Sequence, residues 1–241
     1  MIALVRAELA KLNGSLALLF ALVVPALPAL LCVLALMTRD GPPTWQSMMQ
    51  QFILPIWILL LLPMVATAFV TLLAQIEFRA RAWDHVHALP FARWKVIGAK
   101  AIVYLGSLAG MTILVFTYTY LFALVAGPLT GNTPTGPMLL EETSRNLLAI
   151  SGAALFLCSL QLWVALRYGN FVIPLACGIA GTMIGFAVTI TGTQQADWFP
   201  WVLPIRAANP QAGTEPVVLG VVGGVIVIGA MLVHLSRRIP R

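Results

Sequence analysis

The sequence IEFRARAWDHVHALPFARWKVIGAK, from Ile76 to Lys100, is the most densely charged interruption in an otherwise apolar chain. Strongly hydrophobic runs lie on both sides of it. On a helix, its apolar side chains gather on one side and its charged side chains spread over the other, as is typical of a helix lying at a membrane surface. The apolar side carries Phe78, Ala82, Val86 and Leu89, and the polar side carries Glu77, Arg81, Asp84, His85 and His87. We therefore expect residues 76–89 to form a surface helix between two membrane spans.

The composition excludes a soluble globular domain. Of the 241 residues, 60% are hydrophobic and 9% are charged, whereas soluble domains are about 25% charged. Six apolar runs approach the roughly 20 residues that a helix needs to cross a bilayer core. They cover approximately residues 15–37, 52–73, 101–126, 147–166, 171–191 and 217–235. The sequence thus predicts an all-α polytopic membrane protein, with one transmembrane domain over residues 1–241.

The N-terminal region predicts a surface helix followed by a retained span. Residues 1–11 alternate apolar with charged side chains, a pattern that favours a short interfacial helix. The run 15–37 exceeds the roughly 7–15 apolar residues of a cleaved signal peptide, so we expect it to stay in the membrane. Proline pairs predict bends in the first and second spans, namely Pro25 with Pro28, and Pro55 with Pro63.

The distribution of basic residues predicts the orientation. If the N-terminus is cytoplasmic, 11 of the 14 Lys and Arg residues lie on that side, and only Arg39, Arg145 and Arg206 lie outside. The positive-inside rule then places both termini in the cytoplasm. The net charge of +6 reflects topology, so we expect a lipid bilayer and no nucleic acid as a partner. A bacterial cytoplasmic (inner) membrane fits this composition.

The segment 194–216 is too apolar for an ordinary outer loop. It contains Trp198, Phe199, Pro200 and Trp201, while its prolines prevent a complete span. We expect a re-entrant hairpin that dips into the outer leaflet. The alternative is an aromatic belt that anchors the sixth span.

The spans lack the charged residues that ion-coupled carriers need. None of the six holds Asp, Glu, Lys or Arg between its ends, which argues against self-powered transport. Gln161, Thr67 and Thr71 are candidates to line a pathway, although most such groups bond to helix backbone. Two small-residue pairs predict close helix approach, Gly181 with Gly185 and Gly220 with Gly224.

Neither an enzyme nor a metal site is expected. Glu141, Glu142 and Arg145 resemble the signature of membrane-embedded CAAX-type proteases, but the spacing is one residue short and no span supplies a His except at its end. His85 and His87 point to different sides of a helix, so they are a poor metal pair. No GxxxxGK[ST] motif occurs, so any ATP that drives this chain binds to another chain.

Several short motifs together resemble one transporter family. They are the Ala7-Glu8-Leu9-Ala10-Lys11-Leu12 core, Glu77-Phe78-Arg79, Leu89-Pro90-Phe91-Ala92-Arg93, and the lysines from Lys95 to Lys100. With six spans, the chain resembles the permease subunits of ABC-2 type transporters, above all the short lantibiotic-immunity and bacitracin-efflux permeases.

The resemblance implies partners and roles for particular residues. The permease would pair with itself or with a sister permease, and two ATPase subunits would supply ATP and Mg²⁺, so this chain needs no cofactor. The helix 76–89 would be the coupling helix that the ATPase grips, through Glu77, Arg81, Asp84 and His85, with Arg93 and Lys95 on lipid phosphates. Trp198, Phe199, Pro200 and Trp201 would form an outer gate.

Three functions therefore stay open at this point. The first is an ATP-driven exporter of a small amphiphile, such as an antimicrobial peptide, an antibiotic or a lipid-like molecule. The second is a non-transporting immunity or sensor protein that binds a peptide at its outer face. The third is an intramembrane hydrolase.

Overall fold

The computed structural model describes residues 1–79 and 92–237, and this part of the chain is helical throughout, without strands. Within it, six helical stretches are long and apolar enough to cross a membrane. They are Leu16–Thr38, Ser47–Ile76, Arg93–Thr130, Leu140–Arg167, Val172–Thr191 and Glu215–Ser236. The prediction of an all-α polytopic membrane protein is confirmed.

The first span is broken where the sequence places a proline. The helix α1 (Ile2–Leu12) precedes α2 (Leu16–Val23) and α3 (Ala26–Thr38), and Pro25 separates α2 from α3. Ser15 begins α2 as its N-cap, because its hydroxyl accepts a hydrogen bond of 3.3 Å from the backbone N–H of the first turn. The chain therefore enters the span through a tight, hydrogen-bonded turn.

The second span contains two wide helical segments on either side of Pro55. The π-helices η1 (Ser47–Ile53) and η2 (Trp57–Leu61) flank α4 (Leu54–Ile56), and α5 (Leu62–Arg79) continues the span. A proline removes one backbone donor and clashes with the preceding turn, so the hydrogen-bond ladder has to shift around it. The irregular stretch occupies the half of this span that holds Pro55.

The third and fourth spans extend further than the apolar runs. The helix α7 (Arg93–Thr130) begins before the predicted run, so it includes Lys95 and Lys100. The helix α8 (Leu140–Arg167) carries Glu141 and Glu142 in its first turn. Acidic side chains are favourable there because they face the positive end of the helix dipole.

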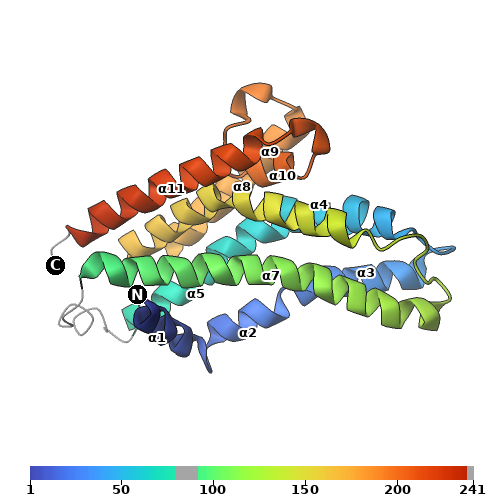
Figure 1. The fold of residues 1–241 in the computed structure, drawn as a ribbon, viewed down its shortest axis with the longest axis horizontal. Coiled ribbons are helices and arrows are strands. Elements are labelled where there is room, and N and C mark those ends of the chain that lie inside the picture. The colour runs from blue at the N-terminus through green and yellow to red at the C-terminus, as the bar shows by residue number, and fades with distance from the viewer. Residues whose placement is uncertain (80–91, 238–241) are drawn as a thin grey trace.

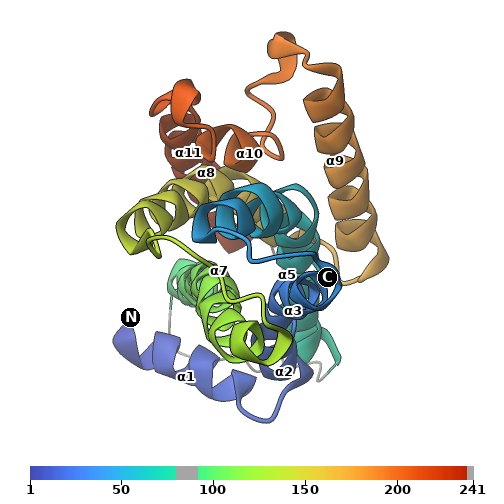
Figure 2. The same cartoon turned by 90° about the vertical axis from the view of Figure 1, so that its right-hand side faces the viewer.

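The fifth and sixth spans are α9 (Val172–Thr191) and α11 (Glu215–Ser236). Figure 1 shows α1 beginning at the same end of the elongated bundle as that at which α11 ends. Figure 2 shows α9 at one side of the bundle, apart from most of the other helices. Three short helices connect α9 to α11, namely η3 (Gln194–Ala196), α10 (Leu203–Ala207) and η4 (Pro210–Ala212).

Close packing of α11 on α8 depends on glycine. A Cβ atom at Gly220 would lie 2.4 Å from the Cα atom of Ala153 and 2.5 Å from its carbonyl oxygen. These are backbone atoms, which cannot rotate away. The predicted close helix approach at Gly220 and Gly224 is therefore present within the chain, between the fourth and sixth spans.

The Gly220→Ala substitution is expected to lower the free energy of unfolding by about 1–3 kcal/mol, because α11 has to move away from α8. Gly229→Ala is the matched control, since a Cβ atom there meets nothing within 4 Å. Thermal unfolding of both variants in detergent measures the difference. Equal midpoints for the two variants would contradict the close contact.

Candidate functional site

The surface contact predicted around residues 76–89 lies largely outside the described residues. Arg81, Asp84 and His85 fall within 80–91. Glu77 belongs to the last turn of α5, but its side chain is also outside what the structure describes. The proposed contacts of these four residues with an ATPase stay a prediction.

The predicted outer gate forms an aromatic cluster with one buried anchor. Trp198 is 63% exposed, whereas Trp201 is only 7% exposed. The ring of Phe199 stacks on that of Trp201 with centroids 5.2 Å apart, and Trp198 meets Phe199 edge-on at 6.4 Å. Pro200 is also buried. The four residues are therefore brought together, although only Pro200 and Trp201 are buried in the bundle.

Trp201 is seated on the glycines of α9. A Cβ atom at Gly181 would lie 2.3 Å from the indole ring, and one at Gly185 would lie 2.9 Å from the Cβ atom of Trp201. The sequence predicted that this glycine pair admits a neighbouring helix, but within the described residues it admits a tryptophan side chain. The indole Nε1 of Trp201 is buried without a hydrogen-bond partner in that part of the chain.

An ion cluster joins the two ends of the segment between α9 and α11. The guanidinium of Arg206 lies 3.5 Å from the carboxylate of Asp197 and 3.3 Å from that of Glu215. Asp197 precedes the aromatic cluster and Glu215 begins α11. Since the side chain of Asp197 is 36% exposed and that of Glu215 is 65% exposed, each pair contributes roughly 1 kcal/mol or less. The buried aromatic contacts hold this segment more strongly.

The two threonines proposed for a pathway use their hydroxyl groups within their own helix. Thr67 donates to the carbonyl of Pro63 at 2.8 Å, and Thr71 donates to the carbonyl of Thr67 at 2.7 Å. The side chain of Thr67 lies against Gly178 of α9, where a Cβ atom would meet it at 2.1 Å. Their part in a pathway stays a prediction without a free hydroxyl to support it.

Gln161 differs from the threonines. Its side chain is 0% exposed, and neither its amide nitrogen nor its amide oxygen has a hydrogen-bond partner among the described residues. A buried amide without partners costs about 1–3 kcal/mol relative to a satisfied one. Gln161 is therefore the pathway candidate with polar groups left to use.

A cavity of about 280 Å³ lies between α7 and α8, and Leu62 of α5 also lines it. Its lining is apolar apart from Thr112, Ser151 and the thiol of Cys158. Leu148 also lines it and is 76% exposed, so the cavity is reached from the outer surface of the bundle. Sequence reasoning did not find this cavity, because it depends on how two helices separate.

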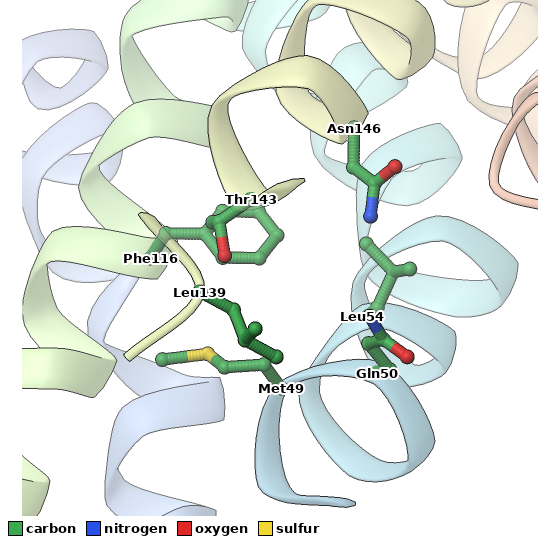
Figure 3. Close-up of a pocket in the computed structure, with 7 residues that line it drawn as sticks. All are labelled: Met49, Gln50, Leu54, Phe116, Leu139, Thr143 and Asn146. Carbon is green, nitrogen blue, oxygen red and sulfur yellow. The ribbon is translucent and has the colours of Figure 1, made fainter. Parts of the chain in front are cut away.

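A second hollow lies between the ends of the second, third and fourth spans (Figure 3). It measures about 10 Å³, which is room for one water molecule. Met49, Leu54, Phe116 and Leu139 line it together with polar groups of Gln50, Thr143 and Asn146. The amide of Gln50 donates to Glu142 at 2.6 Å. The hollow is too small for a substrate, and the contact between Gln50 and Glu142 joins the second and fourth spans.

The fold and the site define a class of protein. It is a multi-pass α-helical membrane protein with few polar side chains inside the bundle. The family model for the ABC-2 family transporter protein matches residues 4–185. The chain therefore belongs to the ABC-2 transporter family, and its role is that of a transporter membrane component. Membership of this family implies association with ABC ATPase components. Neither curated proteins nor solved structures give a match.

Proposed function

We propose that this chain is the permease subunit of an ATP-driven exporter that moves a small amphiphile out of the membrane or the cytoplasm. The amphiphile would be an antimicrobial peptide, an antibiotic or a lipid-like molecule, as for the lantibiotic-immunity and bacitracin-efflux permeases. A second permease, identical or related, would complete the pathway. Both termini would face the cytoplasm of a bacterial cell, as the distribution of basic residues predicts.

The apolar cavity between α7 and α8 is the observation that supports an amphiphile. An apolar cavity of about 150 Å³ holds benzene, and this one measures about 280 Å³. Of its polar groups, the hydroxyl of Thr112 already donates to the carbonyl of Leu108 at 3.0 Å. The cavity therefore suits hydrocarbon and offers little to a sugar or an ion.

The energy would come from outside this chain. The sequence has no phosphate-binding loop, and the apolar runs of its spans contain no charged residue to couple an ion gradient. ATP-driven closure of the ATPases would push the helix 76–89 and shift the populations of inward-open and outward-open states. The wide turns around Pro55 suit a span that bends in this cycle.

Recruitment of the ATPase tests the coupling site. Replacing Glu77 or Asp84 with Lys reverses a charge on the surface that the partner would contact, so the amount of co-purified ATPase is expected to fall about tenfold. The measurement is affinity purification of the tagged permease from cells that also express its ABC ATPase. Arg6→Gln on α1 serves as a control surface change. Undiminished recovery of ATPase with both lysine variants would remove the proposed site.

Transport in vesicles separates the three functions. Inside-out vesicles that contain permease and ATPase are expected to accumulate bacitracin, a lantibiotic peptide or a fluorescent lipid only when ATP is present. Binding of a peptide without ATP-dependent accumulation would favour an immunity or sensor protein. Peptide cleavage that depends on Glu141 and Glu142 would favour a hydrolase.

A further inference from the structure

The helix α1 turns its only acidic residue inward. Ile2 is 74% exposed and Leu9 is 48% exposed, whereas Glu8 is 7% exposed. On a helix surrounded by water, the apolar side chains would be buried and the carboxylate would be exposed. At a membrane the outward side of α1 meets lipid, where a carboxylate is costly. Glu8 therefore requires a cationic partner within the protein.

The partner of Glu8 comes from the beginning of α7. One carboxylate oxygen of Glu8 lies 2.8 Å from Nζ of Lys100, which is 3% exposed, and the other lies 2.5 Å from Nζ of Lys11. Among the described residues, Glu8 and Lys100 are the two charged side chains that are buried. Met1 lies beside α7, since a Cβ atom added at Gly98 would be 3.7 Å from the Cε atom of Met1. Thus α1 is held on α7 at two points along its length.

A buried ion pair is a poor device for stability alone. Desolvation of two charges offsets most of their attraction, and well-packed apolar residues often replace such a pair without loss. The pair differs from an apolar contact in being specific, because a shift of α1 along α7 breaks the contact between Glu8 and Lys100 and leaves Glu8 with Lys11 of its own helix. It therefore fixes one position of α1 against α7 and resists others.

The position of α1 is passed on to the first span. Only Asn13, Gly14 and Ser15 separate α1 from α2. Ser15 stiffens this turn, since its hydroxyl donates to the carbonyl of Leu12 at 2.7 Å and accepts from the N–H of Leu18. A displacement of α1 therefore also displaces α2, because the turn between the two helices is short and hydrogen-bonded.

We propose that Glu8 and Lys100 are positioning residues for transport, which make α1 and α2, the first half of the first span, follow the movement of α7. This inference rests on the proposed function, in which an ATPase drives movement at the end of α7 where Lys100 lies. The ion pair transmits that movement across a contact between segments 92 residues apart in the chain. Without the pair, α1 and α2 lose a polar link to α7, while α3 still packs directly on α7.

Two spin-label distances test the proposal, with labels carried on unnatural amino acids so that the native cysteines remain. The first pair, at Ala3 and Ile113, reports α1 relative to α7. The second pair, at Leu19 and Val222, reports α2 relative to α11. All four sites are exposed. The variants are Glu8→Gln and Lys100→Met, with Arg6→Gln as the control because Arg6 is an exposed cation on α1.

In the unaltered permease in liposomes, the Ala3–Ile113 distance distribution is expected to be narrow. It should broaden about twofold in Glu8→Gln and Lys100→Met, but not in Arg6→Gln, because only the first two break the buried pair. With ATPase, ATP and vanadate added, the Leu19–Val222 distance should shift in the unaltered protein and in the control. In both ion-pair variants this shift should fall to about a third or less, with ATP hydrolysis retained.

Each outcome decides one of the two proposals. An unchanged Ala3–Ile113 width in both ion-pair variants overturns the positioning role, and so does an undiminished Leu19–Val222 shift. A pair that only stabilises the fold would lower the unfolding temperature and leave the shift intact in the folded protein. If the unaltered permease binds no ATPase, the proposed function fails, while the Ala3–Ile113 width still decides the role of the ion pair.

Discussion

Replacing Trp201 with alanine is expected to lower the free energy of unfolding by about 3–5 kcal/mol, the usual cost of removing a large buried aromatic side chain. The indole is 7% exposed, stacks on Phe199, and fills the space left by Gly181 and Gly185. Alanine would leave a cavity between the outer segment and α9. Its neighbours cannot close this cavity without moving a helix.

The neighbouring Trp198 is the matched control for this prediction. It has the same side chain and lies three residues away, but it is 63% exposed. Trp198→Ala should therefore change stability by about 0.5 kcal/mol or less. Unfolding of both variants in a denaturing detergent series, followed by circular dichroism, measures the difference. Comparable losses in the two variants would show that Trp201 does not anchor the segment.

Replacing Gln161 with methionine is expected to change stability and transport in opposite directions. Methionine has nearly the same shape but no amide, so it removes two buried polar atoms that have no partner among the described residues. The free energy of unfolding should rise by about 1–3 kcal/mol. ATP-dependent transport should fall about tenfold or more, because the amide is expected to form hydrogen bonds with substrate, or with other parts of the chain, during the transport cycle.

Ser159→Ala provides the comparison for Gln161. Ser159 is also 0% exposed and lies on the same helix, but its hydroxyl donates to the carbonyl of Leu155 at 2.6 Å. Removal of this hydroxyl should leave the rate of transport within about twofold of the original and the free energy of unfolding nearly unchanged. The reason is that the hydroxyl bonds only to its own helix. Methionine at 161 with both higher stability and full transport would show that the amide has no function.

Much of the architecture followed from the sequence because a bilayer permits few choices. Backbone groups in hydrocarbon must bond to one another, so each long apolar run has to be a helix. Pro25 marked the break in the first span for an equally local reason, the missing backbone donor. The extended beginning of α7 was not foreseen, because Lys100 interrupts the apolar pattern although it lies on the same helix.

The candidate site was less accessible to sequence reasoning. The aromatic cluster around Trp201 could be identified from its composition, but its seat on Gly181 could not, because glycine spacing does not say what fills the space. Gln161 was singled out as a polar residue in a span. Only the tertiary structure shows that the hydroxyls of Thr67 and Thr71 form hydrogen bonds, whereas the amide of Gln161 has no partner among the described residues.

The sequence by itself determined that this protein is a six-span helical membrane protein of the ABC-2 transporter kind, with its charged residues concentrated between the second and third spans. The tertiary structure decided which side of α1 faces the protein, since the partner of Glu8 is a lysine 92 residues away. The usual interpretation of an amphipathic helix places its polar side toward water and its apolar side toward the protein. For a helix next to lipid this interpretation is reversed, so only the contact between Glu8 and Lys100 reveals how α1 is held on α7.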